Sequence, residues 1–143
     1  LFEVDSLQKL NSNLKIDFDF DEKINYIDLD KVQFSQVISN LLHNALKFCS
    51  KDNPVVSIEV KEIKNNISIK IEDNWSWFRK REQEFIFEKY STGYWKSIWL
   101  WLGLYLCKKI VELHAWTIKA WNSKKLGWAM ISIIIPIYQK KEN

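Results

Sequence analysis

Residues 36–48 read QVISNLLHNALKF, and this segment is the best starting point for the fold. Its apolar residues recur at spacings of three and four, which predicts an α-helix with one buried stripe. The helix is expected to begin at Asp30, where Asp30 and Gln33 fit a capping box, and to end near Phe48. Its apolar stripe consists of Phe34, Val37, Ile38, Leu41, Leu42, Ala45 and Phe48.

A second, polar stripe runs along the same helix. Asn is a poor helix former, and an exposed helix face usually carries Lys, Glu or Arg instead. Asn40 and Asn44, one turn apart, offer amide oxygens of the kind Mg²⁺ prefers, and Lys47 offers an ammonium group for phosphate. A solvated polar face is the alternative explanation. The stripe consists of Gln33, Gln36, Asn40, Asn44 and Lys47.

The segments on both sides of this helix predict a layered α/β domain. A second long helix is expected over 102–113, and a short helical segment near 82–87. A hairpin turn is expected at Asn65-Asn66 and another turn at 124–127, and Pro136 fits a strand end. This order predicts an α+β fold, a two-layer α/β sandwich with helices on one face of a mixed β-sheet. The expected strands are 15–20, 26–29, 56–61, 67–71, 117–122 and 129–137.

Asp73 is the second candidate functional residue. Ile67, Ile69 and Ile71 share one face of a strand, and the period of two puts Asp73 on that same inward face. A carboxylate in that position is costly unless it is paired or hydrogen-bonded. An adenine amino group is one possible partner, and a cap on the following turn is the alternative.

Residues 99–104, WLWLGL, open the second long helix. Read with glycine in place of both Trp residues, they would form a flexible loop leading into a helix N-terminus, where backbone N–H groups bind phosphate. Read as written, they form a Trp-rich apolar patch, for which core packing or a partner surface is the simpler explanation.

The composition is typical of one globular domain except in two residue types. Among 143 residues, 47% are hydrophobic and 27% charged, and the net charge of +3 is too small to indicate nucleic acid. Cys49 and Cys107 form no metal or redox motif. There are 8 Trp but only 3 Gly, whereas about ten Gly would be usual for this length.

Four segments in order resemble the sequence boxes of sensor histidine kinases. Residues 36–48 resemble the N box, and residues 72–78, EDNWSWF, resemble the G1 box D-x-G-x-G with both glycines written as Trp. Residues 85–90, FIFEKY, resemble the F box, and residues 99–116 resemble the G2 box, its helix and the H-x-G that follows. The resemblance covers about 14–137 and implies a Bergerat-type ATP-binding fold.

The resemblance also implies roles for particular residues. Asn44 would coordinate Mg²⁺, with Asn40 and Lys47 near the phosphates of ATP. Asp73 would accept a hydrogen bond from the adenine amino group, and Phe48 would pack near the ring. Residues 87–98 would form a mobile lid. Trp75 and Trp77 would shape the pocket floor, and the phosphates would be cradled by Trp99, Trp101, Leu102, Gly103 and Leu104.

In this family the phosphoryl acceptor is a histidine on a separate dimerisation domain. His43 and His114 do not resemble that acceptor, so the chain is expected to be the catalytic fragment alone. The expected divisions are a linker end at 1–13, the catalytic domain at 14–138 and a tail at 139–143. Its expected partners are ATP, a dimerisation and histidine phosphotransfer domain, and a response regulator, with no nucleic acid. A cytoplasmic location is expected, and whether the parent protein is anchored in the inner membrane stays open.

Three other functions stay open at this point. Related ATPases of the chaperone, topoisomerase and mismatch-repair types carry a Glu, the general base for water, where Asn40 stands in this chain. The absence of that Glu argues against efficient ATP hydrolysis here. A serine-kinase anti-sigma factor, which is more closely related to sensor histidine kinases than those ATPases are, is the second alternative. A nucleotide-free interaction module is the third alternative, if the tryptophans are real.

The tryptophans coincide with glycine positions of the family. One genetic code reads the codon UGA as glycine, and another reads it as tryptophan. We hypothesise that these residues are glycines in the natural protein, written as Trp because the wrong genetic code was applied. Because an indole would fill the space that a nucleotide needs, the chain as written is expected to bind ATP weakly or not at all. The six coincident positions are Trp75, Trp77, Trp99, Trp101, Trp116 and Trp128, and glycine is plausible but not required at Trp95 and Trp121.

Overall fold

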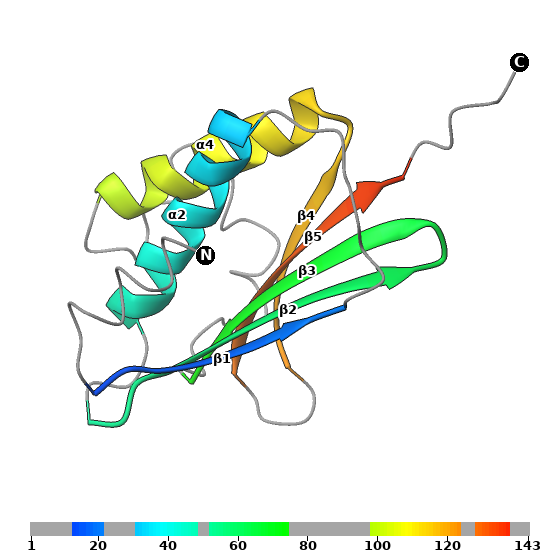
Figure 1. Ribbon diagram of the computed structural model, residues 1–143. Helices are drawn as coiled ribbons and strands as arrows, with labels where there is room; N and C mark the ends of the chain where they lie inside the picture. The colour runs from blue at the N-terminus through cyan, green and yellow to red at the C-terminus, as the bar shows by residue number, and fades with distance from the viewer. Residues whose placement is uncertain (1–12, 22–30, 49–51, 75–97, 124–127, 138–143) are drawn as a thin grey trace, which may run out of the picture.

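The computed structural model describes residues 13–21, 31–48, 52–74, 98–123 and 128–137. In these residues, two helices lie on one face of a five-stranded sheet, which confirms the predicted two-layer sandwich (Figure 1). The elements are β1 (Lys15–Phe20), α2 (Lys31–Phe48), β2 (Val55–Ile63), β3 (Asn66–Asp73), α4 (Ile98–Leu113), β4 (Thr117–Asn122) and β5 (Ala129–Pro136).

The sheet is mixed, as predicted, with the strand order β1-β2-β3-β5-β4. β1 pairs parallel with β2, and the other three pairs are antiparallel. The turn between β2 and β3 lies one residue earlier than predicted, at Lys64 and Asn65, because Asn66 already pairs with Ile63. Both turn residues have positive φ, 49° and 61°, which suits a two-residue hairpin turn that follows the twist of the sheet.

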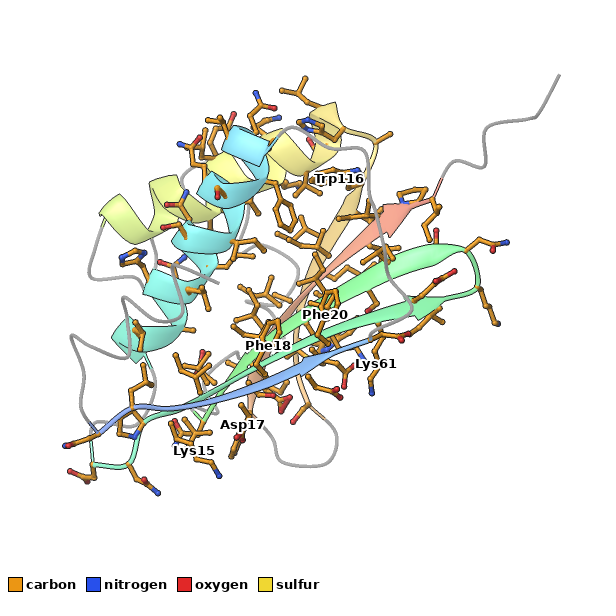
Figure 2. All side chains as sticks on the ribbon, viewed as in Figure 1. Lys15, Asp17, Phe18, Phe20, Lys61 and Trp116 are labelled. Carbon is orange, nitrogen blue, oxygen red and sulfur yellow. The ribbon has the colours of Figure 1, made fainter. Side chains whose placement is uncertain are left out.

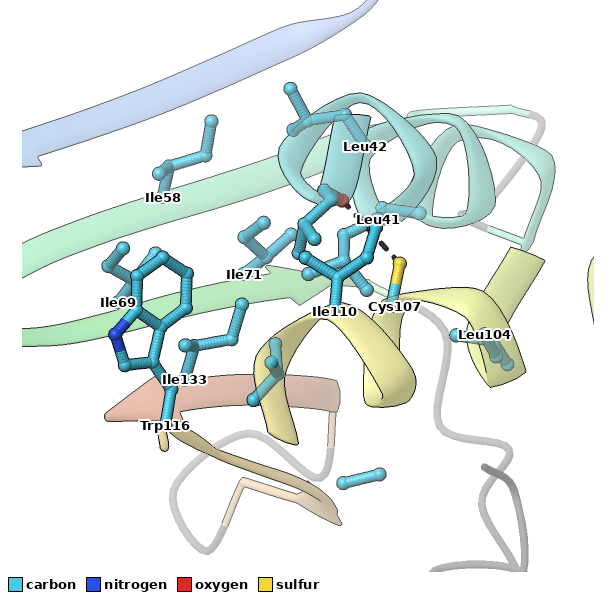
Figure 3. Close-up of a cluster of buried hydrophobic side chains, with 14 of the residues drawn as sticks. Leu41, Leu42, Ile58, Ile69, Ile71, Leu104, Cys107, Ile110, Trp116 and Ile133 are labelled. Carbon is cyan, nitrogen blue, oxygen red and sulfur yellow. Dashed lines mark hydrogen bonds between the residues drawn. The ribbon is translucent and has the colours of Figure 1, made fainter. Parts of the chain in front are cut away.

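Both helices bury one side against the sheet. α2 packs on β3 and on α4, and α4 packs on β4. Figure 3 shows the core between the two layers, where Leu41 and Leu42 of α2 lie opposite the isoleucines of the central strands. Val37, Leu41 and Leu42 are at most 1% exposed, so the predicted apolar stripe is the core-facing side of α2.

α4 ends in a hydrogen-bonded cap. The Trp116 N–H donates to the Val111 carbonyl at 2.9 Å, and the Ala115 N–H donates to the Glu112 carbonyl at 3.0 Å. Ala115 has a φ of 57°, the left-handed conformation that this cap requires and that glycine usually supplies. The cap turns the chain from α4 directly into β4.

The face of the sheet opposite the helices is charged at the β1 edge. The Lys61 ammonium lies 3.2 Å from Glu59 and 3.5 Å from Asp19, and Lys15 lies 3.8 Å from Asp17 (Figure 2). On the helix-facing side of β1, the rings of Phe18 and Phe20 stack with their centroids 6.2 Å apart, and the two residues are 41% and 44% exposed. Among the described residues, neither helix is long and apolar enough to span a bilayer.

Three predicted local elements lie outside the described residues. They are the strand at 26–29, the helical segment near 82–87 and the turn at 124–127, and the proposed capping residue Asp30 lies outside as well.

Candidate nucleotide site

Asp73 ends β3 on the inward face, as its place in the sequence predicts. Only 7% of the residue is exposed, and it follows three buried isoleucines of the same strand. It is paired with Val56 of β2 on one side and with Ala129 of β5 on the other. Asp73 is therefore a carboxylate at the end of an apolar sheet face, held by strands on both sides.

Asn74, for which the sequence pattern predicts no role, holds the end of this strand in place. Its N–H donates to the Val55 carbonyl at 3.2 Å, and its side-chain Oδ1 accepts from the Val55 N–H at 3.2 Å. Its Nδ2 donates to the Asn53 carbonyl at 2.6 Å. The turn at 53–55 is held from its other side by the Lys15 N–H, which donates to the Pro54 carbonyl at 3.0 Å.

The polar stripe of α2 lies at the margin of the core. Asn40 and Asn44 are half-buried, whereas Gln36 on the same stripe is exposed. The Asn44 Nδ2 atom is buried without a hydrogen-bond partner. A buried amide that the protein leaves unsatisfied is costly, and a bound ligand would remove that cost. The backbones of Lys47 and Phe48 form the last turn of α2, and their side chains lie outside the described residues.

The Asn40 side chain contacts α4 at Cys107. Burial raises the pKa of the Cys107 thiol to about 12, and a hydrogen bond with the Asn40 side chain opposes part of that shift. The Cys107 Sγ also lies 3.7 Å from the Val37 carbonyl, a weak contact that joins α4 to α2 (Figure 3). One turn before Cys107 lies Gly103, where an added Cβ would meet nothing within 4 Å.

The stretch 99–104 differs from the predicted loop. α4 begins at Ile98 rather than at Leu102, so these residues form its first turns. Helix N–H groups that are free to bind an anion belong to the first turn, and those of Gly103 and Leu104 come later. The Leu104 side chain is 3% exposed and belongs to the core, so its contribution is to packing. Of Trp99, Trp101 and Leu102 only the backbone is described.

Three of the tryptophans have described side chains. Trp116 is 7% exposed and belongs to the core. Trp128 and Trp121 are half-buried, and the Trp121 indole nitrogen is buried without a hydrogen-bond partner. None of the three has a positive φ, so the backbone at these positions does not require glycine. Trp75, Trp77 and Trp95 lie outside the described residues.

The fold, with a strand-end aspartate and an asparagine stripe on the helix above it, defines a two-layer α/β domain with a candidate nucleotide site. Comparison with known proteins gives the family. Residues 29–139 match the histidine kinase-, DNA gyrase B- and HSP90-like ATPases, and the chain belongs to this family as a catalytic ATP-binding domain of the sensor histidine kinase type.

The relatives found by sequence agree with this assignment, and the structural neighbours share the fold. The chain is 29% identical over 135 residues to the sensor protein KdpD of Escherichia coli, covering 92% of this chain but only 15% of KdpD. The catalytic domain of the histidine kinase ThkA superposes with a TM-score of 0.78 at 20% identity, covering 95% of this chain and 91% of that one. Full-length ShkA in complex with AMPPNP superposes with a TM-score of 0.76 at 18% identity, covering 96% of this chain and 28% of ShkA.

Proposed function

We propose that this domain binds Mg·ATP between α2 and the end of β3 and transfers the γ-phosphoryl group to a histidine on a separate dimerisation domain. The observation that carries the proposal is the buried carboxylate of Asp73, which ends an otherwise apolar sheet face. A purine ring fits an apolar surface, and its amino group is a donor that such a carboxylate can accept. The complex of the related fold of ShkA with AMPPNP, an ATP analogue, supports the choice of nucleotide.

The residues of α2 fit the phosphate and metal end of that ligand. Mg²⁺ prefers oxygen ligands and is usually shared between a protein and the phosphates of a nucleotide. Asn44 carries an amide whose nitrogen finds no partner in the protein, so its Oδ1 could hold the metal while its Nδ2 donates to a phosphate oxygen. Asn40, one turn earlier and half-buried, would lie beside it. When bound, the metal would neutralise charge on the phosphates.

The remaining predicted contacts complete the proposed site. We infer that Lys47 neutralises phosphate charge, that Phe48 packs on the purine, and that Trp75 and Trp77 lie at the pocket floor. The first turn of α4, which includes Trp99 and Trp101, would face the phosphates with its N–H groups.

Transfer to a protein acceptor is favoured over hydrolysis. Phosphoryl transfer depends on positioning and charge neutralisation more than on covalent help from the protein. Asn40 cannot act as a general base for water, because an amide does not accept a proton at neutral pH. We therefore propose slow ATP hydrolysis, a dimerisation domain as the immediate acceptor, and a response regulator as the later one. We propose that this reaction takes place in the cytoplasm, where ATP is supplied.

Transfer of phosphate to a histidine-containing dimerisation domain tests the function. The domain would be mixed with γ-labelled ATP, Mg²⁺ and that second domain, and labelled product would be followed over time. A phosphohistidine is expected, stable in base and lost in acid. Asp73→Asn is expected to abolish labelling. An acid-stable product would instead support a serine kinase, and free phosphate without labelled protein would support an ATPase.

The tryptophans at glycine positions are expected to weaken nucleotide binding. We propose that the chain as written binds Mg·ATP poorly and that a chain with glycine at 75, 77, 99 and 101 binds it well, because glycine lets backbone approach phosphate closely. Calorimetric titration of both chains measures the difference. Micromolar binding by the chain as written would overturn this steric argument.

A further inference from the structure

We propose that Asn74 is a positioning residue that fixes the Asp73 carboxylate for recognition of the purine amino group. This inference rests on the proposed function, because it assigns a role to the residue next to the proposed adenine contact. Asn74 itself is placed outside the binding surface, and its effect is expected to pass through the backbone of β3.

The geometry shows how Asn74 ends the strand. Its backbone N–H continues the β2–β3 ladder by donating to the Val55 carbonyl at 3.2 Å. The next bond of the ladder would ordinarily use the carbonyl of Asn74, but the Val55 N–H donates to the side-chain Oδ1 instead, at 3.2 Å. The side chain thus replaces the main chain in the sheet. The Val55 N–H is therefore satisfied by the side chain of Asn74.

The second half of the amide fastens a different segment. Nδ2 donates to the Asn53 carbonyl at 2.6 Å, so one side chain holds both ends of the turn that precedes β2. That turn is also bonded to β1 through the Lys15 N–H and the Pro54 carbonyl. The end of β3 is therefore fastened to two neighbouring segments of the sheet edge. Asn supplies a donor and an acceptor at this reach, whereas Asp lacks the donor and Ala lacks both.

Asp73 depends on this arrangement because it is the last residue of the strand. Residues at a strand end fray unless their hydrogen bonds are completed, and hydrogen-bond specificity requires a fixed carboxylate. Asp73 has paired neighbours on both sides, Val56 and Ala129, and the next residue, Asn74, adds two hydrogen bonds to Val55 beyond the Asp73–Val56 pair. Loss of the Asn74 amide should let the carboxylate move while leaving the isoleucine face of β3 packed.

The test compares nucleotides that differ in the group that Asp73 would read. Dissociation constants for Mg·ATP and Mg·ITP would be measured, because ITP carries an oxygen in place of the amino group. Asn74→Ala, Asn74→Asp and Asp73→Asn would each be made in the full chain as written and in the chain with glycine at 75, 77, 99 and 101. Stability to urea would be measured for every variant.

Asn66→Ala is the matched control. Asn66 lies at the opposite end of β3, and its Nδ2 also donates to a backbone carbonyl, that of Lys64, at 3.3 Å. The parent chain with glycine at 75, 77, 99 and 101, which is expected to bind nucleotide well, should prefer ATP over ITP before any further substitution. Asn74→Ala and Asn74→Asp are expected to reduce that preference by about tenfold, with ITP affinity unchanged, and Asp73→Asn to abolish it. Asn66→Ala should keep the preference of the unaltered protein.

The outcomes separate the two proposals. Reduced stability in Asn74→Ala with an unchanged preference for ATP would overturn the positioning role and leave the proposed function standing. Equal binding of ATP and ITP by the unaltered protein would overturn the adenine contact of Asp73 and the role of Asn74 with it. Failure of both parent chains to bind either nucleotide would overturn the proposed function itself.

Discussion

Phe34 and Trp116 meet edge to face, with their ring centroids 6.2 Å apart and their planes inclined by 82°. Phe34 lies in the first turn of α2, and Trp116 lies between the cap of α4 and the start of β4. The contact therefore joins the first helix to the chain that returns from the second helix to the sheet. The His114 ring also lies against the indole, with the centroids 4.7 Å apart and the planes inclined by 30°.

Replacing Trp116 by glycine is expected to destabilise the chain as written. The indole is 7% exposed, and removing a buried aromatic side chain from a core costs about 3–5 kcal/mol. Urea unfolding of Trp116→Gly would measure the change. Trp128→Gly, at a half-buried position, is the control and should cost less. Equal or greater stability of Trp116→Gly would show that the indole does not stabilise the core.

The coding DNA tests the same question without a folded protein. We expect UGA codons at the six family glycine positions, because chance substitution would not place one bulky residue at so many of them. Sequencing the gene decides the matter: UGG at these codons would show that the tryptophans are real. The codons in question are those of Trp75, Trp77, Trp99, Trp101, Trp116 and Trp128.

Ala115→Gly is expected to stabilise the domain. Ala115 holds a φ of 57° at the end of α4, and a residue with a Cβ is strained in that conformation. Glycine relieves the strain but has more freedom to lose on folding, so the free energy of unfolding should rise by about 0.5–1 kcal/mol. Thermal unfolding would measure it. The control, Ala45→Gly inside α2, makes the same chemical change and should destabilise by about 1 kcal/mol or more.

Most of the fold could be predicted because its segments have regular periods. The apolar stripe of α2 and the inward face of β3 follow from spacings alone, and β4 has the predicted bounds of Thr117–Asn122. The errors lie where local geometry decides. Asn65 and Asn66 both suit a turn by residue type, but the strand register puts Lys64 in the turn instead. α4 begins early because the apolar residues from Ile98 continue its helical pattern.

The candidate site was predictable only in part. Asp73 could be found because a charged residue interrupts an apolar period, and Asn44 because Asn is unusual on a helix face. Asn74 could not be found in this way, since its main contact joins it to Asn53, which is 21 residues away in the chain. A role that depends on a distant backbone carbonyl leaves no local pattern.

Cys107 is expected to make stability fall at high pH. Burial raises the pKa of its thiol from 9.0 to about 12 in the folded protein. Below pH 9.0 both folded and unfolded chains hold the proton, so the thiol has no effect on the pH dependence. Between these two values the unfolded chain loses the proton first, so the free energy of unfolding falls as pH rises, by about 1.4 kcal/mol per pH unit at most.

Urea unfolding of the unaltered protein and of Cys107→Ala across this range measures the effect. Other groups titrate at the same pH in both proteins, so the difference between the two curves isolates the thiol. Below pH 9.0 the difference should be constant, and above it the unaltered protein should lose stability relative to the variant. A constant difference up to pH 12 would contradict the raised pKa.

Asn44→Ala is expected to separate binding from stability. The substitution removes a buried amide nitrogen that has no partner and places a better helix former in α2, so the free energy of unfolding should stay level or rise by about 0.5 kcal/mol. Affinity for Mg·ATP should fall by about tenfold or more, because the proposed metal and phosphate contacts are lost. Gln36→Ala, at an exposed position of the same stripe, should leave affinity unchanged. If Asn44→Ala instead lowered stability and left nucleotide affinity intact, the amide would be a structural group, and the metal would have to be held elsewhere.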